Sequence, residues 1–215
     1  MKIAPHGVTK SIAALTLGII LTSVGSLVAG EFNPDINIGD PAPVYRELPG
    51  TDGKQHSSSD LKDKRVVVVA FTCNSCPYAV DYEDRLNQLA QKYAAADSAV
   101  GVVAINVNKA EKDALPAMIE RAREKKFTFP YLYDESQQIA RDFGASRTPE
   151  FFVLNADRKI VYMGAMDDDA TGKDIKQHFV AEAIAAALAG KLPETKETVP
   201  IGCNVRYERT RRTKR

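Results

Sequence analysis

The clearest element along the chain is the run over residues 65–71, in which Arg65 is followed by four consecutive valines, Ala70 and Phe71. A strand that is buried on both faces does not alternate polar and apolar residues, so this run indicates a strand in the middle of a sheet. A helix is expected from residue 77 to about 96, because apolar positions recur there at helical spacing, namely Tyr82, Leu86, Leu89 and Tyr93. A second buried run, Val100 to Val107, completes a strand–helix–strand unit.

The rest of the pattern predicts shorter elements. They are a strand over 44–48 before a turn at 51–54, a helical connection over 57–64, helices over 116–125 and 135–143, a strand over 131–133, a hairpin of strands over 150–154 and 160–164, and an Ala-rich helix over 173–189. This order predicts an α/β protein that resembles the thioredoxin-like fold, with a central mixed sheet flanked by helices.

The first thirty residues differ from the body. A short basic stretch with Lys2 and Lys10 precedes an apolar run over 12–28, and small residues follow up to Gly30. This is the layout of a secretory signal peptide that is cleaved after Gly30. An uncleaved membrane anchor is the alternative, because the run is nearly long enough to span a bilayer. Either way we expect an exported protein, periplasmic or otherwise extracytoplasmic.

The remaining length suits a single domain, predicted over 31–192, with a C-terminal tail over 193–215. A domain of this size buries enough surface to need no disulfide staples, so the three cysteines require another explanation. The net charge is +1, but the last ten residues hold six basic side chains and one Glu, which leaves an acidic body. That distribution argues against a nucleic-acid partner. The basic end is expected to be a solvated tail, or else to contact an anionic surface.

Candidate chemistry lies where the first strand meets the first helix. Cys73 and Cys76 are three residues apart at this junction, and Pro77 opens the helix. Free N–H groups at a helix N-terminus favour a thiolate over a thiol, and the spacing lets one sulfur resolve a mixed disulfide on the other. We therefore expect Cys73 to be the exposed attacking thiol and Cys76 the more buried resolving thiol.

A structural zinc site is the other use of such a pair. Zinc needs about four ligands, and the other candidates, His56, His178 and Cys203, stand at no standard spacing. We expect neither a metal nor another cofactor.

Further along the chain, Thr148-Pro149 stands directly before a predicted strand. Together with the cysteines it makes the chain resemble a peroxiredoxin-like redoxin family, within the alkyl hydroperoxide reductases and thiol-specific antioxidants of the thioredoxin-like superfamily. The similarity extends over roughly residues 38–207 and rests on Phe71-Thr-Cys-Asn-Ser-Cys-Pro-Tyr-Ala79, Phe129-Pro-Tyr-Leu-Tyr-Asp134, Thr148-Pro-Glu-Phe-Phe-Val153 and Gly202-Cys203. The resemblance implies a cis Pro149 against the cysteines, and a backbone at Thr148 that binds an extended substrate segment.

The chain departs from the peroxiredoxin pattern at one position. Peroxidatic cysteines lie in Pro-x-x-x-Thr-x-x-Cys, and aligning Cys76 with that cysteine places Cys73 where the Thr belongs and Val69 where the Pro belongs. The hydroxyl that helps bind peroxide is then missing. Thiol–disulfide exchange is therefore favoured over peroxide reduction through Cys76.

Two further residues are candidates for the same site. Cys203 lies eleven residues beyond Leu192, a span of at most about 36 Å, whereas the domain has a radius of gyration near 15 Å. The tail can thus bring Cys203 to resolve a disulfide or sulfenic acid on Cys73 or Cys76. A bridge to a second chain and a passive thiol are the alternatives. Glu150 follows Pro149 and is a candidate proton acceptor for Cys76, although a surface Glu is the commoner outcome.

Three functions remain open. The leading hypothesis is a thiol–disulfide oxidoreductase whose substrate is a protein or small-molecule disulfide, and a peroxidase that uses Cys76 is the second. The third is a copper-binding assembly protein of similar fold, for which His178 is poorly placed.

Overall fold

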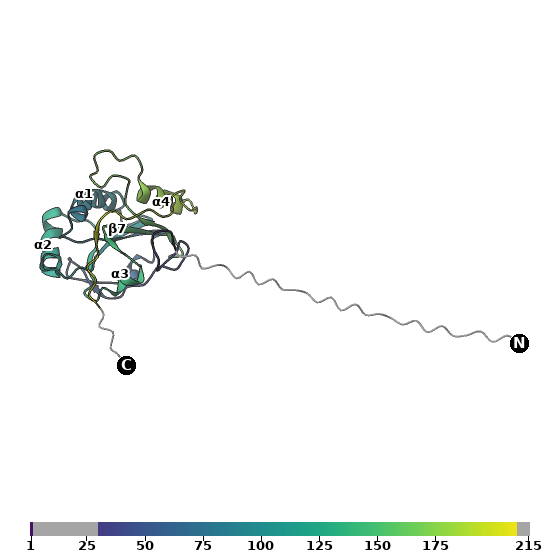
Figure 1. Cartoon of the computed structure of the whole chain (residues 1–215), viewed down its shortest axis with the longest axis horizontal. Helices are drawn as coiled ribbons and strands as arrows, with labels where there is room; N and C mark the ends of the chain where they lie inside the picture. The colour runs from purple at the N-terminus through teal and green to yellow at the C-terminus, as the bar shows by residue number, and fades with distance from the viewer. Residues whose placement is uncertain (2–29, 210–215) are drawn as a thin grey trace.

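The computed structural model of the protein describes residues 1 and 30–209 (Figure 1). A five-stranded mixed sheet in the order β5-β4-β3-β7-β8 forms the centre. Its strands are β3 (Val66–Phe71), β4 (Val100–Asn106), β5 (Tyr131–Tyr133), β7 (Glu150–Leu154) and β8 (Ile160–Gly164). Strand β3 runs parallel to β4 and antiparallel to β7, so the sheet is mixed.

The prediction of a fully buried central strand is confirmed. All six residues of β3 are buried, and β3 pairs along its length with β4 on one side and β7 on the other. Side chains on both faces of β3 therefore enter a core, which is why β3 carries no polar residue.

Helices cover both faces of the sheet, as predicted for this α/β class. The helices are α1 (Pro77–Lys92), α2 (Leu115–Lys125), α3 (Gln138–Asp142) and α4 (Phe179–Leu188), with short 3-10 helices η1 (Ser58–Leu61) and η2 (Glu111–Asp113). One core joins the sheet to α1, α2 and α4, and the other joins it to α3 and the segment that precedes β1. Figure 1 shows α1 and α4 on the opposite side of β7 from α3.

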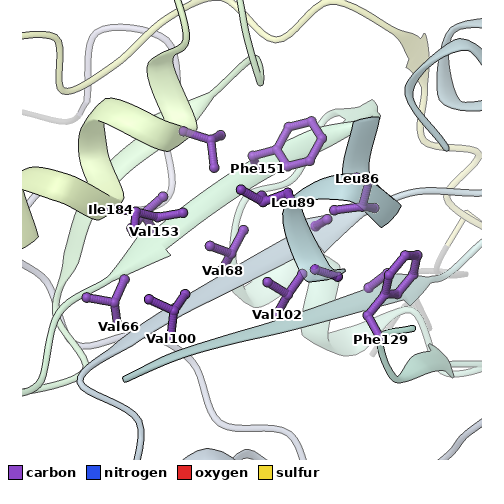
Figure 2. Close-up of a cluster of buried hydrophobic side chains, with 14 of the residues drawn as sticks. Val66, Val68, Leu86, Leu89, Val100, Val102, Phe129, Phe151, Val153 and Ile184 are labelled. Atoms are coloured by element: carbon purple, nitrogen blue, oxygen red, sulfur yellow. The ribbon is translucent and has the colours of Figure 1, made fainter. Parts of the chain in front are cut away.

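The first core is made of side chains that alternate along the strands. Figure 2 shows this cluster, in which strand residues meet helix residues across one face of the sheet; its labelled members are Val66, Val68, Leu86, Leu89, Val100, Val102, Phe129, Phe151, Val153 and Ile184. The alternate residues of β3, Val67, Val69 and Phe71, enter the second core. The packing of both faces fixes the position at which β3 ends and the cysteine loop begins.

Two short ribbons lie outside the main sheet. Strand β1 (Leu48–Pro49) pairs with β2 (Gln55–His56), so the strand expected over 44–48 begins four residues later. Strand β6 (Arg147–Thr148) pairs antiparallel with β9 (Cys203–Asn204). This second ribbon brings the C-terminal segment back to the sheet.

The closing helix is shorter than predicted. It was expected over 173–189, but α4 begins at Phe179. The carboxylates of Asp168 and Asp169 explain the difference, because they accept hydrogen bonds from backbone N–H groups between residues 171 and 177. These bonds hold the segment as a loop and satisfy donors that a helix would use internally. Helix α1 likewise ends at Lys92 rather than near residue 96.

The predicted signal peptide falls on residues 2–29, outside the described part of the chain. Within residues 30–209, no helix has the length and apolar character required to cross a bilayer. Cleavage after Gly30 stays a prediction.

Candidate active site

Cys73 and Cys76 lie in the loop that links β3 to α1. Cys76 is the N-cap residue of α1 and Pro77 is its first residue, as the sequence predicted. The Cys76 carbonyl accepts the N–H of Val80 at 3.0 Å, which closes the first helical turn. Pro77 has no N–H of its own, so it suits a position where the helix leaves donors unpaired.

Both sulfurs are buried, and the expectation of an exposed Cys73 is wrong. Cys73 is 2% exposed and Cys76 is 3% exposed. Cys73 borders a cavity of about 10 Å³ whose other walls include Phe129, Tyr131 and Pro149. Aromatic residues from β5 and its preceding loop thus line the same small cavity as Cys73.

The two thiols differ in acidity because they share a hydrogen bond. That bond from Cys73 is the main cause that lowers the pKa of Cys76 to about 5, with further help from Cys203 and from the backbone of Ala79 at the start of α1. The same bond, together with burial, raises the pKa of Cys73. These opposite shifts favour a thiolate at Cys76 over one at Cys73.

A buried carboxylate that the sequence analysis missed holds the two residues between the cysteines. Asp113 in η2 accepts the backbone N–H groups of Asn74 and Ser75, each at 2.9 Å, and the Ser75 hydroxyl at 2.6 Å. The Tyr131 hydroxyl donates to Asn74 Oδ1 at 3.0 Å. The sequence held a signal for this contact, because the loops that follow two adjacent parallel strands meet at one edge of the sheet. Several polar residues in the loop after the second strand were, however, equal candidates for it.

Thr148 and Pro149 lie against both cysteines. Their peptide bond is cis, in agreement with the resemblance. The Cys76 thiol donates to the Thr148 carbonyl oxygen at 3.0 Å, and Cys73 Sγ lies 3.4 Å from the Thr148 hydroxyl. The backbone expected to bind a substrate segment is already paired within the chain, because Thr148 of β6 lies opposite Cys203 of β9.

Cys203 reaches this site. It is half-buried and packs against the cluster of Cys73, Cys76 and Ala79. Burial, followed by its hydrogen bond to Cys76, raises the pKa of Cys203 to about 11. All three cysteines are free thiols in this structure.

Glu150 is buried rather than on the surface. Its Oε2 accepts the backbone N–H groups of Ser146 at 2.8 Å and Arg147 at 3.0 Å. Burial raises the pKa of Glu150 to about 7, although these two bonds oppose the rise. The carboxylate thus orders the turn before the cis proline, and proton transfer to Cys76 stays a prediction.

Within the described residues, no group of three or more His, Cys, Asp or Glu side chains is arranged to hold a metal ion. His56 is engaged elsewhere, with Nε2 at 3.0 Å from Asp52 Oδ1. His178 is the N-cap residue of α4, far along the chain from the cysteine loop.

Several solved structures are similar to this chain. A hypothetical protein from Sinorhizobium meliloti 1021 is 34% identical and has a TM-score of 0.74, with 80% of this chain and 96% of that chain covered. An uncharacterized conserved protein from Geobacillus kaustophilus is 33% identical with a TM-score of 0.74, covering 81% of this chain and 94% of that one. A thioredoxin-family thiol:disulfide interchange protein from Chlorobium tepidum TLS is 24% identical, covers 60% and 86%, and has a TM-score of 0.50.

The thioredoxin-like fold predicted from the sequence is therefore confirmed. A comparison with curated proteins gives no match. The family model described as Redoxin matches residues 37–178, which include the cysteine loop and the cis proline. The resemblance stated from the motifs is thereby confirmed, and the chain belongs to the Redoxin family.

Proposed function

We propose that this protein is a thiol–disulfide oxidoreductase that uses Cys73 and Cys76. The observation that carries the proposal is the position of Cys76, a thiol of lowered pKa at the start of α1 with a proton-bearing Cys73 hydrogen-bonded to it. A thiolate is the species that attacks disulfides, and a second thiol in contact is what completes the exchange. Membership of the Redoxin family supports the same chemistry.

The reaction proceeds in two exchanges. The Cys76 thiolate attacks one sulfur of a substrate disulfide, the substrate S–S bond breaks, and the departing thiolate takes up a proton. Cys73 then loses its proton and attacks Cys76 Sγ, which forms a Cys73–Cys76 disulfide and releases the second substrate thiol. Two electrons pass to the substrate. We propose that the substrate is a protein or small-molecule disulfide outside the cytosol, in keeping with the signal-like residues 1–30.

The test is to mix the reduced protein with oxidised glutathione and to follow the cysteines by mass spectrometry. The wild-type protein should form the Cys73–Cys76 disulfide. Cys73→Ser should accumulate glutathione on Cys76 or a further disulfide made from it, because its normal resolving thiol is gone. Cys76→Ser should react no faster than free cysteine, and full activity in that variant would refute the proposed role.

Peroxide reduction is the second candidate, and the lowered pKa of Cys76 favours it. Among residues 30–209, the only Thr hydroxyl hydrogen-bonded to a cysteine is that of Thr148, and its partner is Cys73, at 3.4 Å. We therefore expect hydrogen peroxide to oxidise the protein at a rate close to that of free cysteine. A much faster, Cys76-dependent rate would establish a peroxidase instead. Tight stoichiometric copper(I) binding without exchange activity would favour the copper-binding alternative.

A further inference from the structure

The C-terminal strand occupies the backbone edge at which an extended substrate is expected to bind. Strand β9 pairs antiparallel with β6, and this register places Cys203 opposite Thr148 and Asn204 opposite Arg147. Thr148 is also the residue whose carbonyl oxygen accepts the Cys76 thiol. A segment of this chain thus lies where a substrate strand is expected, and it carries a cysteine at the position facing the active site.

Close packing defines this position. Gly202 lies so close to Thr148 that a Cβ at residue 202 would overlap the Thr148 carbonyl. Downstream, the N–H of Val205 donates to the Ser146 carbonyl at 2.9 Å, and the Tyr207 hydroxyl donates to the Ala145 carbonyl at 2.6 Å. The segment is therefore docked by a row of specific bonds along residues 145–148.

The three thiols also differ in accessibility. Cys73 and Cys76 are almost fully buried, whereas Cys203 is half-buried. Cys203 packs against the pair, so it has one side toward Cys76 and another toward solvent. An external thiol or disulfide meets Cys203 before it meets either member of the pair.

We propose that Cys203 is a third redox-active thiol, which exchanges electrons between the buried pair and external thiols through a Cys76–Cys203 disulfide. This inference rests on the proposed function and adds to it the route by which a partner is reached. The partner is a dithiol that attacks the half-exposed sulfur of Cys203 on strand β9. In the reverse direction the partner is a disulfide, which that sulfur attacks.

The exchange balances without an added oxidant. Starting from the Cys73–Cys76 disulfide, the Cys203 thiolate attacks Cys76 Sγ; the old S–S bond breaks, and Cys73 leaves and takes up the proton that Cys203 lost. An external dithiol then attacks Cys203 Sγ with its first sulfur, and Cys76 leaves as a thiolate. The second sulfur of the dithiol displaces Cys203, which regains a proton. The dithiol is oxidised to a disulfide and the chain is reduced by two electrons.

The direction of the second step follows from acidity and access. A thiol of lower pKa is the better leaving group, and Cys76 is the most acidic of the three. The attacked sulfur, that of Cys203, is the more accessible one. An external thiol therefore attacks Cys203 Sγ and releases Cys76 as the leaving thiolate, and the opposite order is not expected.

The test uses Cys73→Ser, which removes the internal competitor. The reduced variant is equilibrated with oxidised glutathione, quenched in acid, and mapped by proteolysis and mass spectrometry. We expect most chains to carry a Cys76–Cys203 cross-link within one molecule. Glutathione on Cys76 with a free Cys203 would overturn the proposal.

Docking of the strand is tested in the same background. Gly202→Val places a side chain against the Thr148 carbonyl, and the cross-link yield should fall by about tenfold or more, as expected when one sulfur leaves its attack position. Val199→Ala, an exposed tail residue outside β9, is the matched control and should leave the yield unchanged. An unchanged yield in Gly202→Val would refute the docked strand as the source of the cross-link.

The wild-type protein separates this inference from the proposed function. If it forms the Cys73–Cys76 disulfide while Cys73→Ser forms no cross-link to Cys203, the exchange function stands and the role of Cys203 is rejected. If it forms neither disulfide, both are rejected. Cys203→Ser should also slow reduction of the oxidised protein by dithiothreitol, and an unchanged rate would count against the route.

Discussion

At the scale of single residues, two cysteines of one loop acquire opposite acidities from a few contacts. Cys76 stands at the N-cap of α1 and receives the hydrogen bond of Cys73, so its thiolate is stabilised despite burial. Cys73 has an apolar cavity beside it and gives up its proton at higher pH. Buried thiols otherwise tend to stay protonated, so the hydrogen bond from Cys73 is the main cause that lowers the pKa of Cys76.

The first prediction concerns this bond. Titration of the wild-type protein, followed by thiolate absorbance in the ultraviolet, should show a Cys76-dependent step near pH 5. Cys73→Ala removes the hydrogen-bond donor, so the step should move several pH units higher. Cys76→Ser is the control that identifies the step. A wild-type step at the ordinary thiol pKa of about 8.5 would contradict the assignment.

A second prediction at this scale concerns Glu150, whose pKa burial raises from an ordinary 4.5 to about 7. Between these values the folded protein holds a proton that the unfolded chain has lost. The contribution of Glu150 to the free energy of unfolding therefore falls by about 3 kcal/mol in total as pH rises from 4.5 to 7. Above pH 7 this contribution no longer changes with pH.

Glu150→Gln removes that ionisation while keeping an oxygen acceptor for Ser146 and Arg147. The variant should gain stability over the wild-type protein as pH rises through this window, as measured by urea unfolding at a series of pH values. Glu194→Gln, at an exposed position, should follow the wild-type curve. A difference that does not depend on pH would argue against a protonated Glu150.

At the scale of elements, the cysteine loop depends on a neighbouring loop. Asp113 of η2 is fully buried, and it satisfies two backbone N–H groups and one hydroxyl at residues 74 and 75. Those donors sit between the cysteines, so the carboxylate fixes the path of the chain from β3 into α1. Without it the N–H groups of two partly buried residues lose their hydrogen-bond partner.

Asp113→Ala should therefore destabilise the protein by about 2–4 kcal/mol, since an unsatisfied buried donor costs roughly 1–3 kcal/mol. Exchange activity should also fall, because Cys76 would no longer be held at the helix N-cap. Chemical unfolding and the glutathione reaction measure the two effects. Glu111→Ala, an exposed residue of the same 3-10 helix, is the matched control. Equal behaviour of the two variants would exclude this role for Asp113.

The elements that could be predicted from the sequence are those whose signal is local. The run of valines in β3 and the hairpin of β7 and β8 carry their burial in their own composition, and the structure has them within one residue of the predicted bounds. The N-cap cysteine and Pro77 are local signals too. Strand β9 is different, because two residues form it and its partner β6 lies more than fifty residues away.

The predictions that the structure contradicts also depended on contacts that the local sequence pattern does not reveal. Helix α4 starts late because carboxylates of Asp168 and Asp169 compete for backbone donors, a choice that helical periodicity does not reveal. The burial of Cys73 depends on aromatic residues that come from β5 and the loop before it. Position along the chain identified the cysteine pair, and tertiary packing buried both members and shifted their pKa values in opposite directions.

At the scale of the whole molecule, the C-terminal segment crosses the edge of the domain and is held at several points. Gln137 is a central one: its Nε2 donates to the carbonyls of Val107 at 2.8 Å and Arg206 at 3.0 Å, and its Oε1 accepts the N–H of Glu208 at 2.8 Å. The buried side chain of Gln137 thus joins the loop that follows β4, helix α3 and the C-terminal tail. The tail in turn carries Cys203, which packs against the cysteine pair.

The last prediction releases this attachment. In Gln137→Ala the carbonyl of Arg206 and the N–H of Glu208 lose their partners, so residues 203–208 should exchange amide hydrogens about tenfold faster or more, since one lost bond of about 1.4 kcal/mol changes an opening equilibrium tenfold. Alkylation of Cys76 should accelerate in parallel, because opening of β9 exposes it. Gln138→Ala, an exposed amide on α3 that bonds only Asp142, should change neither rate. Faster tail exchange with unchanged Cys76 alkylation would mean that another part of the fold, and not the tail, limits access to the active site.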